Sequence, residues 1–157
     1  MTKKIPDGYH TITACIFFKD TKKAIEFYKK AFGAKEMMTM PGPNGKGIMH
    51  AEVKIGDSII MMGDENPTKN SKSPETLGGS AVTFYLYVED VDAAFKKAVS
   101  AGATSVMPIQ DMFWGDRIGS VKDQFGYSWM LATHTKDLSP EEIKQGAQEA
   151  MSQMARK

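Results

Sequence analysis

Two short stretches of the chain alternate apolar and polar residues, as half-buried β-strands do. TITACIFF (11–18) and AVTFYLYV (81–88) are rich in β-branched and aromatic residues and repeat with a period of two. Each stretch leads to an aspartate, Asp20 or Asp90, and then to apolar residues spaced three and four apart over about three helical turns. Because an aspartate can accept hydrogen bonds from the free N–H groups of a first helical turn, both segments predict a strand followed by a capped helix.

The similarity of these two segments indicates an internal duplication. Asp20 corresponds to Asp90, and IGDSII (55–60) corresponds to FGYSWM (125–130) at the same offset of 70. Two independent matches at one offset predict tandem modules, each with the order strand, helix, strand, strand, strand. We therefore expect a single α+β domain over residues 1–157, in which two βαβββ modules form an open, cup-shaped mixed sheet.

The boundaries of the modules follow from turn and cap signals. A segment rich in Pro, Ser, Asn and Gly predicts a linker over 64–79, between a first module of about 10–63 and a second of about 80–134. A C-terminal helix is expected over about 139–155, because it opens with a serine cap, a proline at the first helical position and a glutamate three residues after the cap.

The alternation also predicts which side chains share a face of the sheet. In AVTFYLYV the aliphatic and phenyl positions should lie under the helix, and Thr83, Tyr85 and Tyr87 should face the concave side. The first strand repeats this arrangement and places Cys15 on the concave side. The internal repeat adds these residues to the concave surface: Ser58, Ile60, Met62, Ser128, Met130 and Ala132. Such a surface suits an amphipathic small molecule, although a second core layer accounts for it equally well.

Charge and composition exclude several classes of partner. The chain has 20 basic and 19 acidic residues, and neither sign forms a long block, so it lacks the electrostatic pattern of a nucleic-acid-binding protein. No apolar run reaches the roughly 18 residues of a membrane-spanning helix, and the N-terminal sequence lacks the apolar core of a secretory signal. Cys15 is the single cysteine, which excludes an internal disulfide framework and predicts a cytoplasmic location. We expect a small-molecule ligand or another protein as the partner.

Several motifs together resemble one protein family. KAIEFYKKAFGA (23–34), YVEDVDAAF (87–95), DMFWGDRIG (111–119) and DQFGYSW (123–129) are similar to the vicinal oxygen chelate superfamily of glyoxalases, bleomycin resistance proteins and extradiol dioxygenases. Within it they resemble the PhnB-like branch, often labelled demethylubiquinone-methyltransferase-like. The resemblance implies the duplicated βαβββ fold and the pairing of two chains in a homodimer, but the label says more about fold than about activity.

The resemblance also locates the positions at which this superfamily usually binds a divalent metal. Its enzymes use four side chains, typically histidine and glutamate, one from each outer strand of the two modules. The corresponding positions in this sequence are Thr13, Ile60, Thr83 and Met130. A divalent cation needs imidazole, carboxylate or similar ligands, so we expect no metal and no cofactor at this place. The usual chemistry, in which a metal polarises a substrate oxygen, is then not available there.

Two functions of different classes remain open at this point. The first is a binding or sequestering protein of the bleomycin-resistance type, which needs an aromatic-lined cup and no metal. The second is an enzyme of the lyase, isomerase or transferase type that acts on a small oxygenated metabolite through His50, Glu52, Asp116 or Arg117. His50 and Glu52 share a strand face and can form an acid–base pair, although the solvated side of an edge strand produces this pattern more often. The missing metal ligands favour the binding protein.

The run FWGDR (113–117) combines aromatic and charged residues where the first module has the hairpin sequence PNGKG (43–47). A turn does not require tryptophan or arginine, and both residue types favour ligand and interface contacts. We predict that Trp114 and Arg117 line the mouth of the cup or a dimer seam, and that Asp116 orients Arg117 by a charge-assisted hydrogen bond. His134 is expected to be a surface residue. The predicted ligand-binding set is Trp114, Arg117, Asp116, Phe113, Tyr85, Tyr87, Cys15 and Met130.

Overall fold

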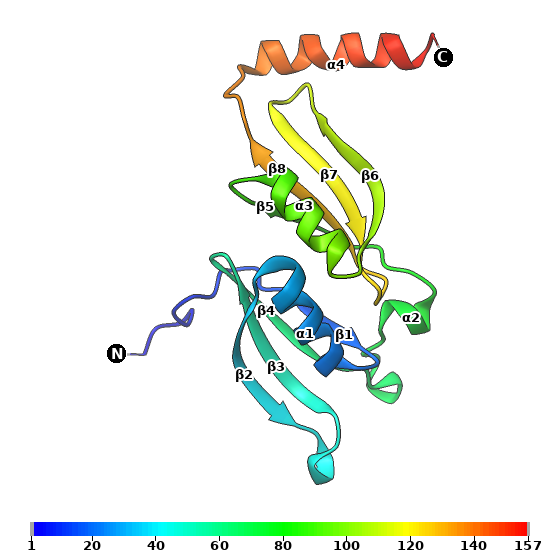
Figure 1. The fold of residues 1–157 in the computed structure, drawn as a ribbon. Helices are drawn as coiled ribbons and strands as arrows, with labels where there is room; N and C mark the ends of the chain where they lie inside the picture. The colour runs from blue at the N-terminus through cyan, green and yellow to red at the C-terminus, as the bar shows by residue number, and fades with distance from the viewer. Residues whose placement is uncertain (1, 157) are drawn as a thin grey trace.

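The computed structural model describes residues 2–156 and contains two βαβββ modules followed by a C-terminal helix (Figure 1). The first module consists of β1 (Cys15–Phe18), α1 (Thr21–Phe32), β2 (Lys35–Pro41), β3 (Ile48–Ile55) and β4 (Ser58–Asp64). The second consists of β5 (Thr83–Tyr87), α3 (Val91–Ser100), β6 (Thr104–Asp111), β7 (Asp116–Lys122) and β8 (Ser128–His134). Short helices are η1 (Pro43–Gly45), η2 (Pro67–Lys69) and α2 (Pro74–Leu77), and the chain closes with α4 (Pro140–Met154). The predicted α+β class, the duplicated modules and the C-terminal helix are confirmed.

Each module has its own four-stranded mixed sheet, in the order β1-β4-β3-β2 or β5-β8-β7-β6. The first strand of each sheet runs parallel to the last, and the other pairs are antiparallel. In Figure 1, α1 and α3 lie beside each other on the same side of the two sheets. The face of each sheet that points away from α1 and α3 is called its outer face below. No helix within residues 2–156 is both long and apolar enough to cross a membrane.

The helix caps form as the sequence predicts. The Asp20 carboxylate accepts a hydrogen bond from the backbone N–H of Lys23 at 3.1 Å, and the Asp90 carboxylate accepts one from Ala93 at 3.0 Å. Ser139 begins α4 with a complete capping box. These bonds satisfy N–H groups that have no partner within their own helix, which explains why each helix begins where it does.

The predicted face of β4 is wrong by one residue. Met61 pairs with Cys15 and lies on the outer face. Ile60 and Met62, which the sequence placed on that face, are instead buried in the core. The reason is that the β3–β4 and β7–β8 turns have different lengths. Paired residues Ile55 and Ser58 enclose only Gly56 and Asp57, whereas the second turn spans residues 123–127. A shift of one residue along a strand moves every side chain to the opposite face.

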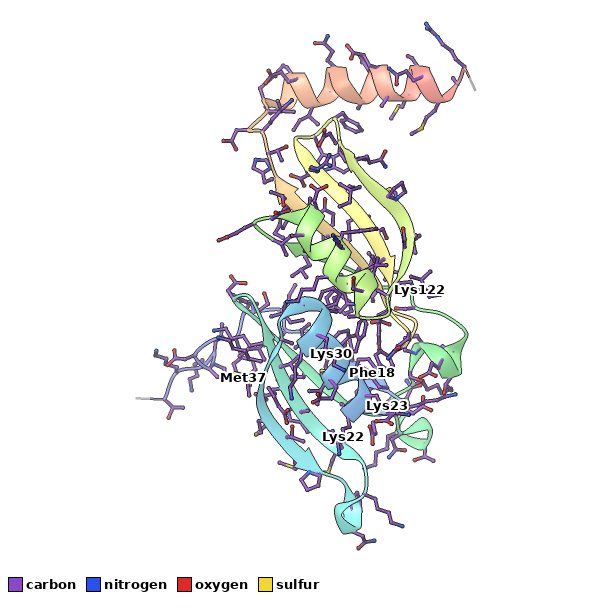
Figure 2. The ribbon with its side chains drawn as sticks, in the orientation of Figure 1. Phe18, Lys22, Lys23, Lys30, Met37 and Lys122 are labelled. Carbon is purple, nitrogen blue, oxygen red and sulfur yellow. The ribbon has the colours of Figure 1, made fainter. Side chains whose placement is uncertain are left out.

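The two modules of the chain are joined by aromatic packing. Phe18 of β1 lies edge-on to Phe125 and to Tyr127 of the β7–β8 turn, with 5.4 Å between ring centroids in both pairs. Tyr28 of α1 packs edge-on against Trp129 of β8 at 5.3 Å. Figure 2 shows Phe18 at this junction, whereas Lys22, Lys23 and Lys30 project from α1. Burial of such large rings makes this junction a continuous core and excludes two independently tumbling halves.

Asp123 lies inside this aromatic junction and is 4% exposed. One carboxylate oxygen accepts hydrogen bonds from the Tyr28 hydroxyl at 2.6 Å and the Trp129 indole N–H at 3.0 Å. The other oxygen accepts the backbone N–H groups of Phe125 and Tyr127, both at 2.9 Å. Burial raises the pKa of Asp123, and these hydrogen bonds oppose that rise. The carboxylate therefore ties α1 of the first module to β8 and the turn of the second.

Replacing Asp123 with asparagine should lower the free energy of unfolding by roughly 2 kcal/mol, because either orientation of the amide points its N–H₂ at two buried donors. Urea unfolding followed by tryptophan fluorescence measures this change. Asp57→Asn, on the exposed β3–β4 turn, makes the same chemical change as a control and should stay within about 0.5 kcal/mol of the original protein. Equal losses in the two variants would show that the four hydrogen bonds to Asp123 add nothing to stability.

Candidate functional site

A buried carboxylate lies under aromatic side chains at one end of the second sheet. Asp116 accepts hydrogen bonds on a single oxygen from the hydroxyls of Tyr85 (3.2 Å) and Tyr87 (2.9 Å) and from the Trp114 indole N–H (3.2 Å). Its other oxygen lies 2.8 Å from Nδ1 of His134. These five residues are called the Asp116 cluster below. Its members come from β5, the β6–β7 turn, β7 and β8.

The strand register brings these side chains to the outer face of the second sheet. Asp116 is paired with His134 across β7 and β8, and Tyr87 is paired with Ala132. Tyr85 and Tyr87 lie two residues apart on β5 and therefore share this face. The register thus places both tyrosines on the face opposite the helix, and Phe84 and Leu86 pack against the core as expected. A concave surface there stays a prediction.

The turn between β6 and β7 positions Trp114 above Asp116. Gly115 adopts φ 96°, and a Cβ atom there would lie 2.2 Å from the Lys136 carbonyl oxygen. Its own carbonyl accepts the backbone N–H groups of Thr135 and Lys136. The segment after β8 therefore presses against this turn, and only glycine fits at position 115.

The electrostatics of the cluster favour an ionised carboxylate. Burial alone would raise the pKa of Asp116, but hydrogen bonds from His134, Tyr87, Tyr85 and Trp114 outweigh it and place this pKa below its usual value. The hydrogen bond to Asp116 raises the pKa of Tyr87 to about 12, with burial and charge repulsion adding to the effect. Tyr87 is therefore a protonated hydrogen-bond donor to Asp116 at neutral pH and is poorly suited to act as a base.

His134 connects the cluster to the start of α4. Its Nε2 lies 3.0 Å from a carboxylate oxygen of Asp137, so the imidazole bridges Asp116 and Asp137. Hydrogen bonds to Asp116 and then Asp137 raise the pKa of His134. The sequence assigned His134 to the surface, and half of its side chain is indeed exposed. Its link to Asp116 depends on strand pairing, which the sequence pattern alone did not show.

Arg117 does not belong to the Asp116 cluster. Its guanidinium forms a two-bond pair with Asp92 in the first turn of α3, at 2.8 and 2.9 Å, and a further bond with Asp111 at 3.1 Å. The predicted Asp116–Arg117 hydrogen bond is wrong, because consecutive residues of a strand point to opposite faces. The position of Arg117 at a dimer seam stays a prediction.

The remaining predicted ligand residues lie at different distances from the cluster. Phe113 packs edge-on against Trp114 at 4.9 Å and sits so close to Gly146 of α4 that a Cβ there would lie 2.9 Å from the Phe113 side chain. Met130 is paired with Tyr85 and shares its outer face. Cys15 lies on the outer face of the first sheet, beside Met61, and burial raises the pKa of its thiol. The chain thus places Phe113 and Met130 near the cluster and Cys15 on the other sheet.

His50 and Glu52 form the acid–base pair that their spacing allows. Nε2 of His50 lies 3.1 Å from a Glu52 oxygen, and the Tyr9 hydroxyl donates to the other oxygen of Glu52. These hydrogen bonds, first from Tyr9 and then from His50, lower the pKa of Glu52. The pair lies on the outer face of the first sheet, where Glu52 is paired with Met61. Sequence reasoning missed Tyr9, which comes from the segment before β1.

The side chains at the usual metal positions do not suit a divalent cation. Thr13 donates its hydroxyl to the His10 carbonyl, and Thr83 and Met130 lie on the outer face of the second sheet. The fourth position, given above as Ile60, corresponds in three dimensions to Met61. Two hydroxyls and two thioethers lack the charge and basicity that such a cation requires. Among residues 2–156, no group of three or more His, Cys, Asp or Glu side chains is arranged to hold a metal.

A groove of about 800 Å³ runs between the modules and reaches the Asp116 cluster. It has a largely apolar wall, which includes Phe32, Ile55, Leu86, Tyr87, Lys97 and His134. Tyr87 and His134 belong to both the groove and the cluster. Most of the groove lies on the side of α1 and α3, and it meets the cluster only at Tyr87 and His134, at the end of the sheet.

Comparisons with known proteins agree with the fold. The model of the Glyoxalase/Bleomycin resistance protein/Dioxygenase superfamily matches residues 9–131. The chain belongs to this superfamily. An uncharacterised member of Mycobacterium tuberculosis is 43% identical over 128 residues, which cover 80% of this chain and 75% of the relative.

Two solved structures have a similar fold. TioX from Micromonospora sp. ML1 has a TM-score of 0.63 and 26% identity, and the match covers 80% of this chain and 98% of TioX. A PhnB protein from Bacillus cereus has a TM-score of 0.61 at 18% identity, over 79% of this chain and 99% of that protein. The second likeness concerns the fold alone, and neither assigns a ligand to this member of the superfamily.

We expect the pKa of His134 to lie above its ordinary value of 6.5, because two carboxylates contact the imidazole. The resulting stabilisation is fully present below the unfolded-state pKa and is lost as pH rises through the folded-state pKa. An NMR titration of the imidazole measures the shift. Asp116→Asn and Asp137→Asn should each lower it, whereas Asp57→Asn should leave it unchanged. A His134 pKa that is not raised in the original protein would contradict the bridged arrangement.

Proposed function

We propose that this protein binds a small organic molecule at the Asp116 cluster and does so without the metal that the superfamily commonly uses. The observation that carries this proposal is a carboxylate only 3% exposed beneath two tyrosines that are 44% (Tyr85) and 61% (Tyr87) exposed. A structural hydrogen-bond network usually buries its aromatic members, because their rings contribute most of the stabilisation. Rings held in place by a buried anchor but open to solvent are organised for contact with another molecule.

The surroundings of the cluster support the same function. Tyr85 and Tyr87 lie with their ring centroids 5.1 Å apart, which forms one continuous aromatic surface. Met130 adds a flexible apolar side chain on the same face, and such side chains adapt to ligands of irregular shape. The groove meets the cluster at Tyr87 and His134 and offers room for a ligand that extends past the end of β5.

A second candidate function is an enzyme that acts on a small oxygenated metabolite. The observation in its favour is the chain of hydrogen bonds from Tyr9 to Glu52 and between Glu52 and His50. A histidine oriented by a carboxylate is a common general base. The outer face of the first sheet around this pair carries Met38 and Met40, which are paired with Glu52 and His50 and are exposed.

We also propose that two copies of the chain associate. Strand β5 lies at the edge of its sheet and pairs with β8 on one side only, next to the outer face that carries the Asp116 cluster. A second copy, related to the first by a two-fold axis, can place its own β5 against this edge. Closed symmetric pairing of this kind is the most common form of protein assembly. A reducing compartment such as the cytoplasm suits the lone Cys15.

Ligand binding should be visible at the indole N–H of Trp114. The chain has two tryptophans, so a ¹⁵N spectrum shows two indole signals, and the buried Trp129 serves as an internal reference. In a screen of aromatic, quinone and heterocyclic compounds, we expect hits that shift the Trp114 signal and not the Trp129 signal. Addition of EDTA should not change their affinity.

The variant Tyr87→Ala should weaken those hits at least about tenfold, because removal of one ring and its hydroxyl costs on the order of 1.4 kcal/mol or more of binding free energy. Arg117→Ala, on the opposite face, should leave their affinity unchanged. A broad library without any compound that shifts Trp114 would refute the proposed binding site. Hits that instead perturb His50 and require Glu52 would favour the enzyme.

The dimer is tested by the mass of the protein in solution. Light scattering after size-exclusion chromatography should give twice the chain mass of 17.3 kDa. The β5 edge has no charged residue, so Thr83→Lys adds a charged side chain to this edge in each copy and should shift the mass toward one chain. The mass of a single chain for the original protein at high micromolar concentration would contradict the association.

A further inference from the structure

We propose that the Asp116 cluster selects organic cations, so that its ligand carries an ammonium, amidinium or similar group that sits over the rings of Tyr85 and Tyr87. This inference rests on the proposed function and names the chemical class of its ligand. Three features of the cluster carry it: the open faces of the rings, the uncompensated charge of the carboxylate beneath them, and the hydrogen-bonding state of the tyrosine hydroxyls.

The ring faces attract positive charge. Tyr85 and Tyr87 are tilted by 42° to each other with 5.1 Å between centroids, and both are exposed. Trp114 joins them through the shared oxygen of Asp116. The face of an aromatic ring is electron-rich and attracts a cation placed over it, more strongly when the contact excludes water.

The carboxylate beneath the rings keeps its negative charge. Arg117, which follows Asp116 in the chain, points to the other face and is engaged by Asp92 and Asp111. His134 contacts both Asp116 and Asp137. Even when the imidazole is protonated, its one positive charge faces the two negative charges of these carboxylates, so Asp116, His134 and Asp137 together stay negative.

The basic residue that shares this strand face lies far from the carboxylate. Lys122 is at the opposite end of β7 from Asp116, which corresponds to about 20 Å along an extended strand. Charges separated by more than roughly 8 Å at the surface are largely screened at physiological salt. Strands β5, β6 and β8 contain no lysine or arginine, so a ligand on the outer face over Asp116 has no lysine or arginine of the sheet beside it. Lys97 of α3 lines the groove on the other side of the sheet.

The tyrosine hydroxyls can accept hydrogen bonds from a ligand and have no proton left to donate. Each hydroxyl proton already points to Asp116, as does the indole proton of Trp114. The free lone pairs of Tyr85 and Tyr87 therefore suit an N–H or O–H donor. An anionic ligand would meet no free donor among these three side chains and would be repelled by the carboxylate. The cluster thus discriminates against anions as well as in favour of cations.

The test compares choline with 3,3-dimethylbutan-1-ol, which has the same shape but no charge. Each is titrated into the ¹⁵N-labelled protein while the indole signals of Trp114 and Trp129 are followed. We expect choline to shift Trp114 with a dissociation constant about tenfold lower than that of the alcohol, which corresponds to about 1.4 kcal/mol. Trp129 should not move.

Variants separate the charge of the carboxylate from the contribution of the rings. Asp116→Asn should reduce the preference for choline from about tenfold to about threefold, since the charge of the carboxylate is removed and the rings remain. Asp57→Asn, with the same chemical change at an exposed residue outside the cluster, should retain the full preference for choline. Tyr87→Leu keeps the carboxylate, so it tests the ring faces independently if Asp116→Asn fails to fold; it should weaken choline more than the alcohol.

The outcomes distinguish this inference from the proposed function. Equal affinity of choline and the alcohol in the original protein overturns the cation preference, but a shift of Trp114 by either compound still supports a ligand site at the cluster. A preference for choline that stays at its original size in both Asp116→Asn and Tyr87→Leu also overturns the inference, because the selectivity then comes from elsewhere. Absence of any Trp114 shift with these probes and with the compound screen removes both the inference and the proposed site.

Discussion

The structure depends on a single buried carboxylate at the junction of its two modules. Asp123 accepts four hydrogen bonds, of which one comes from α1 of the first module and three come from the second. Aromatic rings surround it, so water cannot replace any of these partners, and each unsatisfied donor would carry the full cost of desolvation. Tyr127, close to Asp123 in the same turn, adds a second connection, because its hydroxyl bonds the backbone N–H and carbonyl of Phe17. The DQFGYSW motif is thus an architectural element that joins duplicated halves.

This junction decides which surfaces remain free for function. With α1 and α3 packed against each other, both sheets turn their outer faces away from the main core. The outer face of the second sheet carries the Asp116 cluster, and that of the first carries the His50–Glu52 pair. The two aspartates have opposite environments. Asp123 is enclosed by core rings that cannot reach a ligand, whereas Asp116 lies under rings that solvent reaches. The first carboxylate stabilises the fold, and the second organises a recognition surface.

The run FWGDR shows how far local sequence could locate a site. Its place in a hairpin and its asymmetry with PNGKG singled out Trp114 and Asp116, and both are in the cluster. The partner chosen for Asp116 was wrong, because strand alternation separates it from Arg117. Three of its four partners come from β5 and β8, which are distant from Asp116 in the chain. The β4 error has a similar origin, since a turn of different length shifted the register and no local motif records that shift.

The sequence by itself determined the modules, their caps and the alternating faces of β5, because these depend on interactions between residues a few positions apart. Period-two alternation, an aspartate before each helix and an internal repeat are all local or periodic signals. Only the tertiary structure decided which side chains contact the carboxylate oxygens of Asp116, namely those of Tyr85, Tyr87, Trp114 and His134. It also decided that Tyr9 reaches Glu52. Such convergence depends on the pairing of distant strands and on turn lengths. A change of one residue in either reverses the direction of every side chain that follows.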